Sequence, residues 1–146
     1  MAHTTTEQGL IEIAREYFRR VDAGRGDLVE LFNDDIEVYF PKFGVVKGKQ
    51  ALFELASGLF TRIAELSHDQ DSMLCVANGD DVVVEGLSRG KTKSGVEWAG
   101  GKTPTGRFCN VFHFRGEKID RVHIHLDPDY GSEDRERFLW GMERSW

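Results

Sequence analysis

Hydrophobic positions recur with a helical period in the first 65 residues of the chain. Apolar side chains over residues 10–21 fall on one helical face, and Gly24 then provides a common C-terminal stop. Thr4 and Glu7 have the spacing of a capping box, which predicts the start of this helix. A second helical pattern, with a wide apolar face, covers residues 51–63. Two amphipathic helices are therefore predicted.

The segment between these two helices predicts a short helix followed by a strand. Asp27 has the residue type and position of an N-cap for a helix over residues 28–32. The sequence Asn-Asp-Asp then interrupts that helix, and residues 36–40 alternate between apolar and polar as far as Pro41. We expect a strand that ends at the proline.

The second half of the chain has the pattern of antiparallel strands joined by tight turns. Four predicted strands cover residues 72–77, 81–87, 106–114 and 118–126. Asn78 and Gly79 form a strong turn signal between the first pair, and Gly116 and Glu117 lie between the second pair. Helices followed by a meander of strands predict an α+β fold with the helices on one side of a curved sheet.

Length and charge place limits on the class of protein. The 146 residues fit a single domain over 1–146, with residues 1–5 disordered and 128–146 forming a C-terminal tail. We expect the apolar residues of the tail to fold back over the domain or onto a partner, and these are Phe138, Leu139, Trp140 and Trp146. The net charge of −6 and the lack of a Lys/Arg run argue against binding to nucleic acid.

The sequence shows neither a pattern for export or membrane insertion nor a disulfide framework. It has no apolar run of membrane-spanning length and no signal peptide pattern, so a cytoplasmic protein without membrane contact is expected. Cys75 and Cys109 are too few for a disulfide scaffold and lack CxxC spacing. We expect two reduced, buried thiols.

The stretch HIHLD carries the most evident candidate chemistry. His123, His125 and Asp127 alternate, so on a strand they share one face. With His113 on the neighbouring strand they could hold a metal ion, but HxH alone is a weak metal motif. The hairpin register decides where they point, because a slip of one residue moves every side chain to the other face.

One of the two possible registers separates polar from apolar side chains. It gathers Phe108, Asn110, Phe112, Phe114, Val122, Ile124 and Leu126 on one face and the histidines on the other. Unpaired imidazoles in an apolar interior would each cost about 1–3 kcal/mol. We therefore predict that His123 and His125 lie on the outer face of the sheet.

Several segments resemble the nuclear transport factor two superfamily, and its SnoaL-like branch above all. They are YFRRVDAGRGDLVELFNDDIEVYFP, VVKGKQAL, GDDVVVEG and PTGRFCNVFHFRGEKIDRV. The branch is related to polyketide cyclases, limonene epoxide hydrolase and ketosteroid isomerase. The resemblance implies a cystatin-like α+β barrel, a cone of three N-terminal helices on a strongly curved, mostly antiparallel sheet. It also implies an apolar cavity for small apolar or aromatic molecules and frequent dimerisation through the outer sheet face.

The resemblance transfers some of the isomerase site to this chain. Tyr17 matches a tyrosine that donates a hydrogen bond to the developing enolate, and Asn110 matches the second donor, an aspartic acid in that enzyme. The acidic base of the isomerase falls on Phe40, and the acid of the hydrolase-like and cyclase-like relatives falls on Ile124. Both acids are therefore missing here.

Two more residues could move a proton in the cavity. His68 could be a general base or a surface histidine, and Glu85 could be an inward carboxylate with a raised pKa or an outward, ion-paired one. The candidate catalytic residues are Tyr17, His68, Glu85 and Asn110. The candidate ligand-binding residues are Tyr39, Phe43, Leu59, Trp98, Phe108, Phe112 and Ile124.

Two classes of function follow from these residues. One is a cofactor-independent isomerase, cyclase or dehydratase for a small apolar or polycyclic substrate, without a metal. The other is a non-catalytic apolar-ligand-binding or accessory dimeric protein, favoured by the loss of both acids. A metal-dependent enzyme built on HIH is a further alternative. We expect a homodimer through the outer sheet face, which would include His113, His123 and His125.

Overall fold

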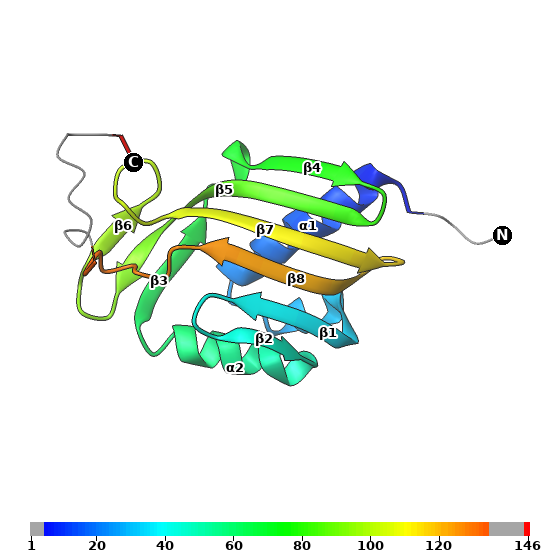
Figure 1. The fold of residues 1–146 in the computed structure, drawn as a ribbon, viewed down its shortest axis with the longest axis horizontal. Coiled ribbons are helices and arrows are strands. Elements are labelled where there is room, and N and C mark those ends of the chain that lie inside the picture. The colour runs from blue at the N-terminus through cyan, green and yellow to red at the C-terminus, as the bar shows by residue number, and fades with distance from the viewer. Residues whose placement is uncertain (1–4, 135–144) are drawn as a thin grey trace.

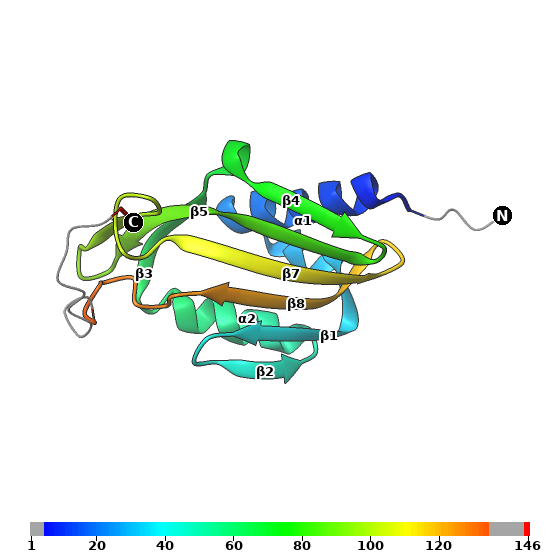
Figure 2. The ribbon, with the colours of Figure 1, turned by 45° about the horizontal axis from the view of Figure 1, so that its top comes forward.

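A computed structural model of the chain describes residues 5–134 and 145–146. Two α-helices, α1 (Glu7–Asp22) and α2 (Lys49–Leu59), lie on the same side of one sheet (Figures 1 and 2). The strands are β1 (Phe32–Phe40), β2 (Gly44–Lys47), β3 (Ile63–His68), β4 (Leu74–Asn78), β5 (Asp81–Thr92), β6 (Glu97–Ala99), β7 (Arg107–Arg115) and β8 (Lys118–Leu126). No helix of these described parts is long and apolar enough to cross a membrane.

The sheet is mixed but mostly antiparallel. Its strand order is β2-β1-β8-β7-β5-β3, and β4 and β6 also pair with β5. Only the pairing of β1 with β8 is parallel among the described strands. The long strand β5 pairs with β4 along its first half and with β3 and β6 along its second half. The predicted α+β arrangement, with helices on one side of the sheet, is confirmed.

Helix α1 buries its apolar face against β3, β4 and β5. The side chain of Thr6 caps the helix by accepting a hydrogen bond from the backbone N–H of Gly9 at 3.0 Å. The predicted capping residue, Thr4, lies outside the described residues. The buried side chains recur at helical spacing, and they are Leu10, Ala14, Tyr17 and Phe18.

The segment between α1 and α2 differs from the prediction. The short helix is a 3₁₀ helix over Gly26–Leu31 that begins after Arg25, rather than a helix over residues 28–32 capped by Asp27, and β1 begins at Phe32 instead of residue 36. The three polar residues that were expected to end the short helix, residues 33–35, lie within β1, where its register with β8 shifts. The strands β2, β3 and β6 carry too little alternating hydrophobicity to be predicted.

Both predicted hairpins are present. Strands β4 and β5 meet at Asn78 and Asp81, so the turn is Gly79-Asp80, one residue later than expected. Strands β7 and β8 are joined at Gly116-Glu117. A register shift after His113 then places Asn110 opposite Ile124.

This register confirms that the histidines of HIHLD lie on the outer face. Phe112, Phe114 and Val122 are fully buried between sheet and helices, whereas His125 is exposed on the opposite side. A three-residue loop between the strands would produce this register. The structure instead combines a two-residue turn with an irregularity at Asp120, which has the same effect on side-chain direction.

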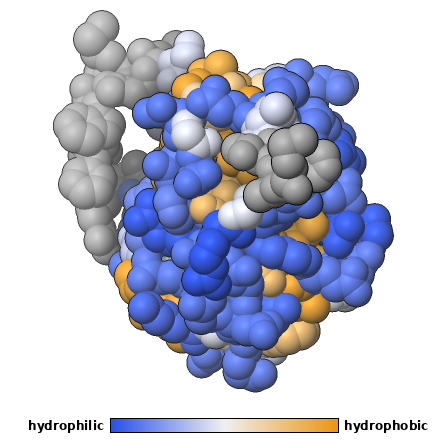
Figure 3. Space-filling view, turned by 90° about the vertical axis from the view of Figure 1, so that its right-hand side faces the viewer, coloured by the Kyte–Doolittle hydropathy of each residue, from blue (hydrophilic) through white to orange (hydrophobic). Residues whose placement is uncertain are grey.

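The end of the molecule that carries the β7–β8 turn is largely hydrophilic (Figure 3). The hydrophobic areas visible on this face are small and separated by hydrophilic residues. The candidate site is a cavity between the sheet and the helices.

Candidate functional site

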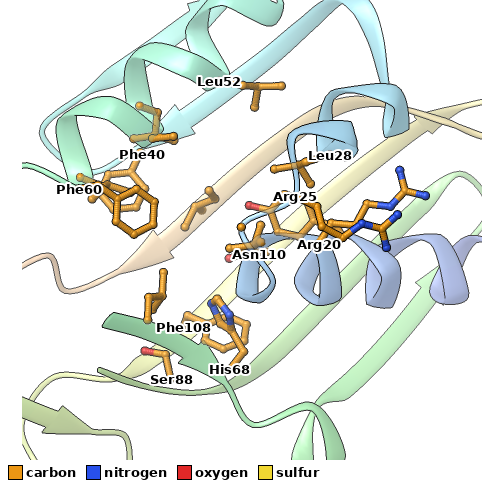
Figure 4. A pocket seen from close by; sticks show the side chains of 18 of the residues that line it. Arg20, Arg25, Leu28, Phe40, Leu52, Phe60, His68, Ser88, Phe108 and Asn110 are labelled. Carbon is orange, nitrogen blue, oxygen red and sulfur yellow. The ribbon is translucent and has the colours of Figure 1, made fainter. Parts of the chain in front are cut away.

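An apolar cavity of about 290 Å³ lies between the inner face of the sheet and the two helices (Figure 4). Helix α2 and the residue that follows it contribute a continuous apolar wall: Leu52, Phe53, Leu55, Ala56, Leu59 and Phe60. The sheet contributes Phe40, Phe108, Ile124 and Leu126. The polar lining is limited to Tyr17, Arg20, Arg25, His68, Ser88, Asn110 and Tyr130. A few polar groups in a mainly apolar cavity are typical of small-molecule sites.

His68 reaches the cavity from the end of β3 and is held by Asp22 at the end of α1. The His68 Nδ1 atom lies 2.6 Å from Asp22 Oδ1, and the backbone N–H of His68 donates to Asp22 Oδ2 at 2.9 Å. Gln70 Nε2 donates to the same Oδ2 atom at 2.9 Å. Because Nδ1 is engaged, Nε2 is the ring nitrogen left to act on a ligand.

The carboxylate of Asp22 is ionised at neutral pH. Partial burial is the largest single effect and raises the pKa of Asp22, but the hydrogen bonds and charge of His68, with the Gln70 hydrogen bond, outweigh it. The net result is a lowered pKa. An ionised Asp22 fixes the orientation of the His68 ring through its contact with Nδ1.

The ring of His68 is also positioned by aromatic packing. It lies edge-on to Phe18 and to Phe108, with ring centroids 5.0 Å apart in both pairs. Its side chain is only 12% exposed. The imidazole is therefore held from one side by Asp22 and from two others by aromatic rings.

Tyr17 presents its phenol to the same cavity. Its ring packs edge-on against Phe18, Phe32 and Phe112. Burial, and then the negative charge of Asp22, raise the pKa of Tyr17 well above its usual value. The phenol is therefore a hydrogen-bond donor at every physiological pH and cannot serve as a base.

Asn110 is a buried polar residue without a full set of partners. It is 3% exposed, and its Oδ1 atom is buried with no hydrogen-bond partner among the described residues. A buried amide oxygen left unpaired costs about 1–3 kcal/mol, which a ligand could offset. A half-turn of the carboxamide exchanges its acceptor for an N–H donor, so Asn110 can serve a carbonyl or a hydroxyl.

The structure brings together part of the predicted site. Tyr17, His68 and Asn110 line the cavity, together with the predicted ligand contacts Leu59, Phe108 and Ile124. Phe112 is fully buried beneath Tyr17, Phe43 packs against the core, and Trp98 is 2% exposed behind Tyr130. None of these last three lines the cavity.

Two predicted site residues lie on the other face of the sheet. Glu85 is exposed and borders a separate shallow hollow with Cys109 and His125, so its inward alternative is wrong. Tyr39 packs against the rings of His123 and His125, with centroids 5.7 and 5.3 Å apart. Successive side chains of a strand point to opposite faces of the sheet. Tyr39 and Glu85 each alternate with the inward-facing side chains of their own strands, so both point outward.

The outer histidines make structural contacts. His123 Nε2 lies 2.8 Å from Glu37 Oε2, and His113 Nδ1 lies 2.7 Å from Asp81 Oδ1. Over the described stretches of chain, no group of three or more His, Cys, Asp or Glu side chains is arranged to hold a metal ion. Cys75 and Cys109 are free thiols, and burial is the main cause that raises the pKa of each.

Sequence reasoning missed Asp22 and Tyr130. Asp22 had one available signal, because an acidic residue in the last turn of a helix opposes the helix dipole and calls for a separate explanation. Tyr130 follows the last strand in a segment that reads as a turn. Its place in the cavity depends on packing against Trp98, which no sequence pattern indicates.

The comparison with protein families matches the SnoaL-like domain over residues 14–122. The chain therefore belongs to the SnoaL-like domain family. No curated protein matches it.

Solved structures place this family member in the NTF2-like fold. An NTF2-like protein of unknown function from Burkholderia pseudomallei has a TM-score of 0.71 at 16% identity, covering 82% of this chain and 92% of that one. TerC co-crystallised with polyporic acid has a TM-score of 0.70, also at 16% identity, with the same coverage. A candidate polyketide cyclase from Pseudomonas putida has a TM-score of 0.70 at 14% identity, covering 83% of this chain and 93% of that one. At these identities the likeness shows the fold alone.

Proposed function

We propose that this protein is a cofactor-independent enzyme, an isomerase, cyclase or dehydratase, that acts on a small apolar or polycyclic substrate in a conical cavity. The observation that carries the proposal is the contact between Asp22 and His68 at the wall of an apolar cavity. A carboxylate that orients an imidazole is a common arrangement for a general base. The polyketide cyclase assignment among the similar structures agrees with this class of substrate.

In the proposed reaction His68 Nε2 removes a proton from carbon next to a substrate carbonyl. The C–H electron pair moves into the new C–C double bond, and the carbonyl oxygen becomes an enolate oxygen. Tyr17 and Asn110 donate hydrogen bonds to that oxygen. These hydrogen bonds strengthen as negative charge develops on it. The proton is then returned to another carbon, or to a leaving hydroxyl that departs as water.

The position of the base explains the two missing family acids. Phe40 and Ile124 both line the cavity, so the positions of those acids are occupied by apolar side chains. His68 reaches the cavity from a different strand and has its own acidic partner. The loss of both acids is therefore compatible with catalysis.

Exchange of protons with solvent tests the proposal without knowledge of the natural substrate. The probe is β-tetralone, a bicyclic ketone with exchangeable protons beside its carbonyl, followed by proton NMR in heavy water. We expect the wild-type protein to accelerate the exchange and His68→Ala to lose about 100-fold or more of that acceleration. Glu85→Gln, on the opposite face, is the matched control and should exchange at the wild-type rate.

A second function is favoured if the cavity binds without reacting. Calorimetric titration with β-tetralone measures binding in the same samples. Binding without accelerated exchange would reject the enzyme and support an apolar-ligand-binding protein, the function suggested by the loss of both acids. Exchange that survives in His68→Ala would reject the assigned base.

We also propose that two copies pair through the outer sheet face. A row of side chains crosses six strands there, and successive members are register partners: Val76, Val83, Val111, His123, Tyr39 and Val45. Val76 is 53% exposed and Val45 is 57% exposed. Apolar side chains aligned on one open sheet face favour burial against a second sheet.

A further inference from the structure

The cavity has a second polar level, separate from Tyr17 and Asn110. Ser88 lines the cavity and its backbone N–H donates to the carbonyl oxygen of Gly106 at 2.7 Å. Gly106 precedes Asn110 by four residues along the chain that becomes β7. An extended chain rises about 3.3 Å per residue, so the Ser88 and Asn110 levels are about 13 Å apart.

The stretch between the two levels is apolar. Phe108 lies between Gly106 and Asn110 and faces the cavity, and its register partner on β8 is Leu126. Both side chains line the cavity, and Figure 4 shows Phe108 close to Ser88. A ligand that reaches both polar levels must therefore have an apolar middle.

Tyr130 adjoins the second level through Trp98, whose indole contacts both Ser88 and the Tyr130 ring. The Ser88 hydroxyl accepts from Trp98 Nε1 at 3.2 Å and lies 3.4 Å from the Gly106 carbonyl oxygen, so its capacity is used. The indole of Trp98 in turn packs on the Tyr130 ring, with centroids 4.6 Å apart. Tyr130 lines the cavity, and no hydrogen bond of its hydroxyl occurs within residues 5–134 and 145–146.

Burial keeps this phenol in its donor form. It raises the pKa of Tyr130 to about 12, with a smaller contribution from the charge of Asp127. A protonated phenol can donate to a carbonyl oxygen or exchange hydrogen bonds with a hydroxyl. A carboxylate at this position would face an apolar wall with no cation beside it among the cavity-lining residues near Ser88.

The cations of the cavity are already neutralised. Arg25 donates to Asp27 at 2.5 Å, and Arg20 donates to Glu16 at 3.0 Å. Arg25 also lies 3.5 Å from Glu16. The cavity therefore selects through hydrogen bonds and apolar contact more than through charge.

We infer that the ligand is an elongated, uncharged molecule with oxygen at both ends, and that Tyr130 is the specificity residue for the second oxygen. The inference rests on the proposed function, since it assigns the first oxygen to the carbonyl held by Tyr17 and Asn110. The second oxygen is a hydroxyl or carbonyl on the far side of an apolar ring system. Hydroxylated bicyclic or polycyclic ketones have this chemistry.

Two ketones that differ by one hydroxyl test the inference. The probes are β-tetralone and its derivative with a phenolic hydroxyl at the far end of the aromatic ring. Dissociation constants are measured by calorimetry for the wild type, Tyr130→Phe and the outer-face control Tyr39→Phe. We expect the wild type and Tyr39→Phe to bind the hydroxylated probe about three- to tenfold more tightly, the effect of one hydrogen bond.

Tyr130→Phe should remove this preference and bind β-tetralone with unchanged affinity, which also shows that its cavity is intact. A wild type without the preference, a Tyr130→Phe variant that keeps it, or a wild type that binds neither ketone would each overturn the inference. Proton exchange in the same samples separates the two proposals. Exchange without the preference rejects only the role of Tyr130, and the preference without exchange rejects only the catalytic proposal.

Discussion

At the scale of single residues, Asp22 is the residue on which the site depends most. It accepts three hydrogen bonds, two from His68 and one from Gln70. An acidic side chain at the C-terminal end of a helix is disfavoured by the helix dipole. These hydrogen bonds offset the unfavourable interaction with the helix dipole, and they hold the carboxylate beside the His68 imidazole.

Replacement of Asp22 by asparagine should make the free energy of unfolding less dependent on pH in the acid range. The pKa of Asp22 is lowered from its ordinary value of 3.8, so folding favours the ionised form. Its contribution is fully present above pH 3.8 and is lost as the pH falls through the folded value. We expect Asp22→Asn to lower the free energy of unfolding by about 1–3 kcal/mol at neutral pH.

The difference between wild type and Asp22→Asn should then shrink as the pH falls below that ordinary value. Urea unfolding across the acid range measures it. Asp69→Asn, an exposed neighbour of His68, is the control and should follow the wild-type curve. A difference that stays constant down to low pH would contradict the lowered pKa.

The sequence indicated His68 but not its partner. Histidine stands out by residue type, because its ordinary pKa lies near neutrality. Asp22 is 46 positions away from His68, and their contact depends on how α1 crosses β3. Tyr17 and Asn110 were predicted from the family resemblance, which indicates positions in a fold that spacing alone does not give.

At the scale of elements, β5 organises both the cavity and its second polar level. Its Gly90 lies beneath Trp98, the ring that supports Tyr130. A Cβ atom at Gly90 would lie 2.0 Å from the backbone oxygen of Glu65 and 2.4 Å from the Trp98 ring. Glycine is therefore required by the close approach of β3 and β6 to β5.

Gly90→Ala should destabilise the protein by about 1–3 kcal/mol or more, since neither the strand backbone nor the indole can yield freely. Urea unfolding gives the value. Gly58→Ala on α2 is the control, because nothing lies within 4 Å of its added Cβ, and it should be neutral or slightly stabilising. Equal stability of Gly90→Ala and wild type would show that these strands are less closely packed.

The elements that sequence predicted best are those with long, regular patterns. The β7–β8 register followed from burial, because only one register puts Phe108, Phe112 and Ile124 on one face. The parallel pairing of β1 with β8 has no local signal, since it joins residues more than 80 positions apart. Strand β6 covers only Glu97–Ala99, too short for a period to emerge.

At the scale of the whole molecule, the sheet separates two kinds of surface. Its inner face carries the cavity, and its outer face carries an aligned row that includes Val76, Val111 and Val45. His123 interrupts the row but is paired with Glu37. A histidine paired in this way can be buried at an interface at a lower cost than a free one.

If two copies pair through this row, a charge at its centre should separate them. Val111 lies between Val83 and His123 in the row, so lysine there would bury an unpaired ammonium group in the interface. We expect sedimentation equilibrium to give a dimer for the wild type and a monomer for Val111→Lys. Val96→Lys, at a position 41% exposed in the β5–β6 connection, should stay dimeric. A monomeric wild type, or a Val111→Lys variant that stays dimeric, would reject pairing through this row. We also expect a Val111→Lys monomer to exchange protons at the wild-type rate, because each cavity lies within one chain.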